Sequence, residues 1–191
     1  MEPYARVTCA IYVAIIDYLV MVETAKYDVI RKLTKAEIRR YPSLIIARVE
    51  GHGNAGFNIL FRFITGGNKQ KARVAMTAPV ISERIEMTAP VLSDADSIAF
   101  VMPEGYELET TPEPLDKRIK IIKIPERYVA VLRFSGRWAK SIFEKRSKEL
   151  LDELAKMNVN PRGNFFSMRY NPPYTPWFMR RNEVAVEVNL A

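Results

Sequence analysis

The segment Val74-Ala-Met-Thr-Ala-Pro-Val-Ile81 returns almost unchanged as Ile85-Glu-Met-Thr-Ala-Pro-Val-Leu92, eleven residues further along the chain. Three residues separate the two copies, a length that suits the turn of a β-hairpin. Because proline has no N–H to donate, Pro79 and Pro90 each fit a sheet edge, a bulge or a strand end. The repeat therefore predicts a hairpin of two antiparallel strands.

Helix-like and strand-like segments lie on both sides of this hairpin. Residues 57–65 carry apolar side chains at i, i+3, i+4 and i+7, which predicts a helix that Asn54 caps and Gly66-Gly67 ends. Residues 138–157 have one apolar and one charged face and predict the longest helix of the chain. Apolar or alternating runs predict further strands at residues 26–32, 37–42, 44–49, 97–102, 117–124, 128–134, 165–170 and 180–188.

Two parts of the chain share one architecture. Residues 44–51 and 128–136 are each an apolar strand that ends in glycine and precedes one of the two predicted helices. The match concerns the order of elements and not the identity of residues. It indicates two related halves that share one sheet or barrel.

The composition sets limits on the kind of site the chain can hold. Of 191 residues, 48% are hydrophobic and 27% charged, which is typical of a folded globular protein. One cysteine, Cys9, and one histidine, His52, exclude an intramolecular disulfide, a cysteine-based metal site and a multi-histidine metal site within one chain. The net charge of +7 favours anionic partners, but the charges are spread along the chain, so nucleic acid is not an expected partner.

The N-terminal segment contains an apolar run that sets it apart from the rest of the chain. Residues 10–22 are apolar except for Asp17, and this run is shorter than the roughly 20 residues of a membrane-spanning helix. It is a weak membrane anchor, an extra packed element, or the product of an upstream start codon with Met21 as the true start. We favour the last two and divide the chain into an extension, residues 1–21, and a domain, residues 22–191.

Several side chains are candidates for binding, each with a structural alternative. His52 lies between two glycines and either ligates a metal or haem iron or is an exposed turn residue. The stripe of Phe57, Leu60, Phe61 and Ile64 either lines the pocket of a flat apolar ligand or packs a helix on a sheet, and packing is the commoner role. Arg62 lies off the stripe and either meets a ligand carboxylate at the rim or is solvated.

Arg180 and Arg181 begin a predicted strand, so their side chains are expected on opposite faces. One of them either holds an anion or pairs with a carboxylate such as Glu183 or Glu37. We find no paired carboxylates at pocket-like positions, no nucleophile elbow, no phosphate-binding loop and no dinucleotide fingerprint. The residues therefore favour a binding protein over an enzyme, with no catalytic residues and no resident metal site.

The motifs, taken in their order, resemble the SOUL haem-binding protein family. The doubled Met-Thr-Ala-Pro-Val at residues 76 and 87, followed by Arg180-Arg-Asn-Glu-Val, is the most specific part of this resemblance. Supporting motifs, which extend the resemblance over about residues 22–189, are Val22-Glu-Thr-Ala-Lys-Tyr-Asp-Val-Ile, Glu37-Ile-Arg-Arg-Tyr-Pro, Phe61-Arg-Phe-Ile-Thr-Gly-Gly-Asn, Phe100-Val-Met-Pro, Phe134-Ser-Gly and Tyr170-Asn-Pro-Pro.

The resemblance implies an α+β fold in which two pseudo-symmetric halves form a distorted, barrel-like antiparallel sheet with two main helices packed outside. It also implies reversible, non-enzymatic binding of haem or related tetrapyrroles in an apolar groove beside the first helix, with basic residues near the propionates. Phe57, Leu60, Phe61 and Ile64 match the apolar positions of that helix, and Arg62 matches a basic one. Asn54 and Thr175 stand where the family pattern has basic residues.

We therefore expect a haem or porphyrin carrier, buffer or sensor that is cytoplasmic and monomeric. Two alternatives stay open: a binder of another amphipathic small molecule, and a protein–protein interaction module. The fold resemblance extends to gyrase-inhibitor-like and effector-binding domains, which favour cations and often use a buried acid. The sequence shows no clear buried acid, and its positive charge disfavours cations.

Overall fold

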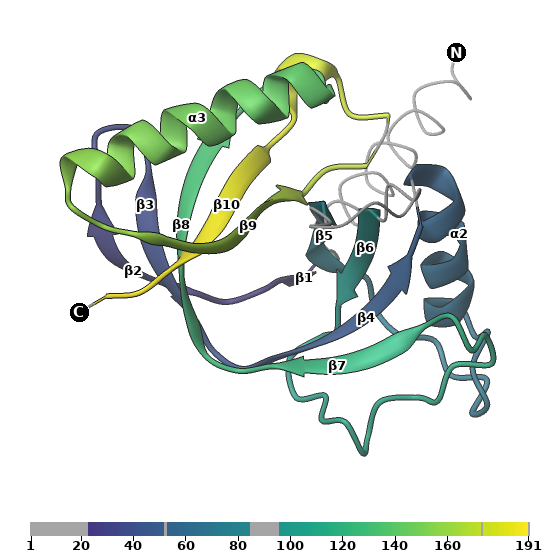
Figure 1. Ribbon diagram of the computed structural model, residues 1–191. Coiled ribbons are helices and arrows are strands. Elements are labelled where there is room, and N and C mark those ends of the chain that lie inside the picture. The colour runs from purple at the N-terminus through teal and green to yellow at the C-terminus, as the bar shows by residue number, and fades with distance from the viewer. Residues whose placement is uncertain (1–22, 52, 85–95, 173, 191) are drawn as a thin grey trace, which may run out of the picture.

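The computed structural model describes residues 23–51, 53–84, 96–172 and 174–190 (Figure 1). Within them, nine strands form one sheet in the order β2-β3-β8-β10-β9-β5-β6-β4-β7, with antiparallel neighbours throughout, and β1 pairs with β5 in parallel. The bounds are β1 Glu23–Thr24, β2 Asp28–Lys32, β3 Glu37–Tyr41, β4 Leu44–Glu50, β5 Thr77–Arg84, β6 Asp96–Val101, β7 Lys120–Ile124, β8 Arg127–Phe134, β9 Pro161–Arg169 and β10 Asn182–Val188.

The sheet curves strongly, and two helices pack on its outer side (Figure 1). Helix α2, Gly53–Ile64, lies against β4 and β6, and helix α3, Lys140–Lys156, lies against β8, β9 and β10. The described strands at the two ends of the sheet, β2 and β7, do not pair, so the barrel-like sheet stays open. This arrangement confirms the predicted α+β class with two outer helices.

The helix bounds correct one prediction. Helix α2 begins at Gly53, so Asn54 lies inside its first turn and is not its N-cap. Gly56, also inside the helix, lets α2 approach β6 closely, because a Cβ there would lie 2.5 Å from Ile98 Cγ2. Gly66 ends the helix as predicted, since its φ of +113° suits glycine and breaks the helical path.

Several strand bounds also differ from the prediction. Strand β10 begins at Asn182, so Arg180 and Arg181 precede it, and a short 3₁₀ helix, η1 (Trp177–Met179), lies just before them. The first copy of the repeat contributes β5, which pairs with β6 and β9. The second copy, residues 85–92, lies outside the described residues, and so does the predicted hairpin turn that leads into it.

The alternation of side chains gives the sheet two different faces. On β10, Val184, Val186 and Val188 point outward and pack with Leu150 and Leu154 of α3. The intervening residues of each strand point inward. The inner face carries Tyr41, Val129, Phe166 and Met168 on one half, and Ile46, Ala99 and Val101 on the other. In the described part of the chain, none of the helices is long and apolar enough to cross a membrane.

Candidate functional site

Helix α2 packs on the sheet and also presents aromatic surface to solvent. Leu60 and Ile64 are buried against β4 and β6. Both therefore pack the helix on the sheet and do not line an open pocket. Phe61 is 44% exposed, and its ring stacks on that of Phe57 with centroids 6.1 Å apart and planes 13° apart. Phe57 meets Phe100 edge-on at 5.2 Å, which anchors the stacked pair to the sheet.

Arg62 is exposed in the last turn of α2, directly after Phe61. It lies near an ion pair in which Arg118 Nη2 donates to Asp116 Oδ2 at 2.7 Å. The side-chain hydrogen bond from Arg118 is the largest cause that lowers the pKa of Asp116 to about 2, and the charge of Arg62 adds to it. Arg118 is therefore the direct partner of Asp116, and the charge of Arg62 acts on the same carboxylate from farther away.

The other predicted binding residues have different positions. His52 lies outside the described residues. The half-buried Arg180 donates from Nε to the carbonyl of Thr175 at 2.7 Å. Arg181 donates from Nε and Nη2 to Glu183 Oε1 at 2.9 and 2.7 Å, so it takes the structural role that was the alternative to anion binding.

The carboxylate of Glu183 corrects the expectation that the chain has no buried acid. It is fully buried on the inner face of β10 and accepts hydrogen bonds from two arginines and one tyrosine. Arg39 donates from Nη1 to Oε2 at 2.7 Å and from Nη2 to Oε1 at 3.0 Å. The Tyr170 hydroxyl donates to Oε2 at 2.8 Å. Arg39 also pairs with Glu37 on its own strand.

In this buried ion cluster, Glu183, Arg39 and Arg181 each keep their charge. Burial alone would raise the pKa of Glu183, but the hydrogen bond and charge of Arg39, with the charge of Arg181, lower it below its usual range. Burial would lower the pKa of Arg39, and its interaction with Glu183 raises it instead. Burial raises the pKa of Tyr170, so the phenol stays a donor. Because two arginines already neutralise this acid, it offers no free carboxylate to a cationic ligand.

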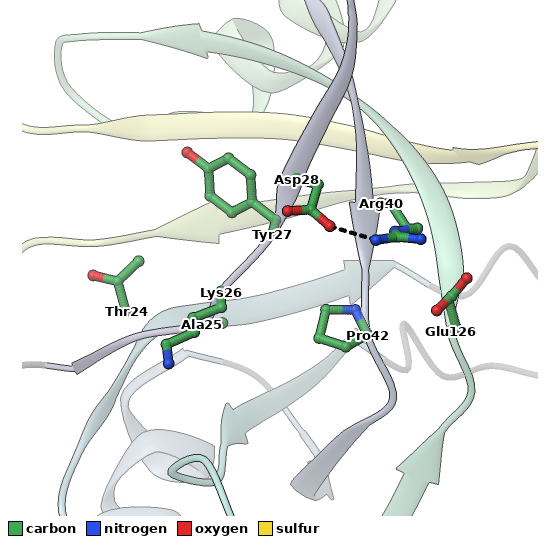
Figure 2. Close-up of a pocket in the computed structure, with 8 residues that line it drawn as sticks. All are labelled: Thr24, Ala25, Lys26, Tyr27, Asp28, Arg40, Pro42 and Glu126. Carbon is green, nitrogen blue, oxygen red and sulfur yellow. Dashed lines mark hydrogen bonds and ion pairs between the residues drawn. The ribbon is translucent and has the colours of Figure 1, made fainter.

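A pocket of about 470 Å³ is lined in part by Tyr27 (Figure 2). The ring of Tyr27 also lies against the guanidinium of Arg39, whose Cζ is 4.1 Å from the ring centroid. Both signs of charge line the pocket, and Arg40 of β3 donates to Asp28, its register partner on the neighbouring strand β2, at 2.7 Å. Its volume falls in the usual range for small-molecule sites, but its polar, balanced lining does not suit a flat apolar ring. The lining residues are Thr24, Ala25, Lys26, Tyr27, Asp28, Arg40, Pro42 and Glu126.

Among the described residues, no group of three or more His, Cys, Asp or Glu side chains is arranged to hold a metal ion. The axial-ligand role of His52 stays a prediction, because that residue lies outside the part of the chain that the structure describes.

Comparison with solved structures finds chains of similar fold. The C-terminal domain of EcmrR superposes with a TM-score of 0.56 at 9% identity, covering 86% of this chain and 99% of that one. A hydrolase from Listeria innocua gives a TM-score of 0.55 at 10% identity, with coverages of 84% and 94%. An uncharacterized conserved protein from Listeria innocua gives 0.55 at 12% identity, with coverages of 81% and 92%. At these identities the likeness shows the fold alone.

Comparison with the curated proteins finds no match. The family model of the SOUL heme-binding proteins matches residues 22–187, which takes in all the strands and helices described above except the last residue of β10. The motifs that suggested this family thus lie within one continuous match. The chain belongs to the SOUL heme-binding protein family.

Proposed function

We propose that this chain binds haem or a related tetrapyrrole reversibly, as a carrier, buffer or sensor, and performs no chemistry on it. Membership of a haem-binding family supports the ligand class. The observation that carries the proposal in this chain is the stacked pair Phe57–Phe61 on the outside of α2, next to the exposed cation Arg62. We propose that pair and Arg62 as the centre of the binding surface.

The chemistry of the ligand matches this surface. A tetrapyrrole is a flat aromatic ring with carboxylates at one edge, so it gains from stacking on phenylalanine and from a guanidinium at its rim. Phe61 is the more exposed member of the pair, and Phe57 supports it from the sheet side. Leu60 and Ile64 hold the helix in place and do not contact the ring directly. Arg181, engaged by Glu183, is left out of the proposed surface.

A hemin titration of the full chain, followed by the Soret band, tests this placement. Phe61→Ala removes the exposed ring, and we expect about a tenfold loss of affinity, which corresponds to about 1.4 kcal/mol of stacking and burial. Arg62→Glu reverses a rim charge and should weaken binding further at low salt. Leu151→Ala on α3 is the matched control, because Leu151 is 43% exposed on the other helix. Equal affinity in the wild type and in both α2 variants would reject this surface.

The axial ligand is tested separately with His52→Ala. If His52 ligates the iron, the variant keeps hemin on the surface but loses the shift of the Soret band. If the spectrum is unchanged, another group or water ligates the iron. The stacking proposal is independent of that outcome.

The two alternatives have unequal support. A cation-binding role needs an available buried carboxylate, and Glu183 is already bound by two arginines. The interaction-module hypothesis stays a prediction.

A further inference from the structure

A second cavity, of about 190 Å³, lies on the inner face of the sheet, where the two halves of the fold meet. It is distinct from the surface of α2, which packs on the opposite side of β4 and β6. Six strands contribute to its wall. The lining residues are Ile46 and Arg48 of β4, Ile81 of β5, Ser97 and Ala99 of β6, Ile122 and Ile124 of β7, Arg127 of β8 and Phe166 of β9.

The lining combines an apolar wall with two cations. Six of the nine described lining residues are apolar, and the charged ones, Arg48 and Arg127, are both arginines; none of these nine is acidic. Such a lining is that of a small-molecule site, in which a few polar groups orient an otherwise apolar ligand. Two guanidiniums at an apolar cavity select for a negative charge.

Arg127 lies on the cavity wall between an aromatic ring and a more distant carboxylate. Its guanidinium lies 5.2 Å from the ring centroid of Phe166, on the cavity wall. Its Nη1 is 3.7 Å from Glu187 Oε2, well beyond the 2.7–2.9 Å of a strong charge-assisted hydrogen bond. Glu187 is shared with Arg162, also at 3.7 Å, so that carboxylate is divided between two cations.

The volume limits the size of the ligand. Sites for drug-sized molecules begin at about 300 Å³, and this cavity is smaller. A separate pocket of about 10 Å³ shares Ile81, Arg127 and Phe166 with it and is also lined by Met168. A tetrapyrrole does not fit such a space, so its occupant differs from the ligand proposed for α2.

We propose that the inner cavity binds a small amphipathic monocarboxylate, such as a single-ring aromatic or short-chain acid. Its apolar body lies against Ile46, Ile81 and Phe166, and its carboxylate is bound by Arg48 and Arg127. The site joins β4, β6 and β7 of one half to β8 and β9 of the other. A bound acid therefore ties the two halves together and raises the melting temperature of the protein.

Calorimetric titration of the full chain with three probes that share one body tests the ligand class. The probes are 3-phenylpropionate, 3-phenylpropanol and 3-phenylpropylamine. We expect saturable one-to-one binding of the acid, at least tenfold tighter than the alcohol, with no binding of the amine. Failure of the acid to saturate, or equal affinity for acid and alcohol, would overturn the proposal.

Variants locate the site. Arg127→Gln and Arg48→Gln should each weaken binding of 3-phenylpropionate at least tenfold. Lys123→Gln is the matched control, because Lys123 lies between Ile122 and Ile124 on β7 but is half exposed and pairs with Glu107. Ala99→Leu keeps every charge and fills the cavity, so it should abolish binding even if an arginine variant folds poorly. Unchanged binding in Ala99→Leu would place the acid elsewhere and contradict the proposal.

Binding of the acid and binding of hemin can be tested separately, so that either one can be refuted without the other. Arg127→Gln should leave hemin affinity unchanged, and Phe61→Ala should leave 3-phenylpropionate affinity unchanged. Loss of both ligands in either variant would show that they share one site, which contradicts the separation inferred from the structure.

Discussion

Replacing Glu183 with glutamine removes the one negative charge that two arginines share inside the protein. The carboxylate accepts five hydrogen bonds: two from Arg39, two from Arg181 and one from Tyr170. The side chains of Glu183 and Arg39 are 0% and 2% exposed. The variant keeps the shape of the side chain but leaves two guanidiniums facing a neutral amide.

The expected cost follows from this geometry. Breaking a buried ion pair by removing one partner costs about 3–5 kcal/mol, because the remaining charge stays desolvated. Glu37, which is 28% exposed and pairs with Arg39, offsets part of that charge. We therefore expect the lower end, about 3 kcal/mol, which for a chain of this length is about 6–12 °C in melting temperature.

Urea unfolding followed by tryptophan fluorescence measures this loss. The control is Glu187→Gln on the same strand, whose carboxylate is 31% exposed and lies 3.7 Å from each of its two cations. A partly exposed pair of this kind contributes less than about 1 kcal/mol. If both variants lose the same stability, the cluster does not stabilise the fold as described.

Three further outcomes are expected. At pH 7 the free energy of unfolding of the wild type should exceed that of Glu183→Gln by the full amount given above. Because the folded pKa of Glu183 is lowered, that difference should shrink by about 1.4 kcal/mol per pH unit as the pH falls below the unfolded value of about 4.3, and a constant difference down to pH 3 would contradict the assignment. Leu60→Ala should lower the free energy of unfolding in urea by about 2–5 kcal/mol, and Phe61→Ala should lower it clearly less, because of the two only Leu60 is fully buried. The reverse order would show that α2 is rotated about its axis. Gly67→Ala should cost about 1–3 kcal/mol in thermal unfolding, because its Cβ would lie 2.7 Å from the Arg62 carbonyl oxygen, and an unchanged melting temperature would contradict that contact.

Local periodicity predicts the two helices and most strands, whereas the α+β class follows from the resemblance to the SOUL family. The sequence could not decide which face of α2 is buried, because apolar residues surround almost the whole helix. The spacing chosen from the sequence included Phe61, whereas the structure buries Phe63 and exposes Phe61. The rotation is fixed by contacts with the sheet: Leu60, Phe63 and Ile64 are buried against it, and Gly56 lies close to Ile98 of β6.

The buried cluster could be inferred only in part. Arg181 and Glu183 are two residues apart, so an extended backbone places them on one face, and the sequence offers Glu183, like Glu37, as a carboxylate partner. Its other partner, Arg39, is 144 residues away in sequence, and the two meet because β3 and β10 both pair with β8. The inner cavity needs side chains from six strands, and no short segment contains its pattern.

The titration of the full chain with hemin, beside Phe61→Ala and Leu151→Ala, tests the central claim most directly. We expect saturable one-to-one binding with a shifted Soret band, about tenfold weaker in Phe61→Ala and unchanged in Leu151→Ala. Non-saturating binding, or equal affinity in all three proteins, would contradict tetrapyrrole binding on the aromatic surface of α2.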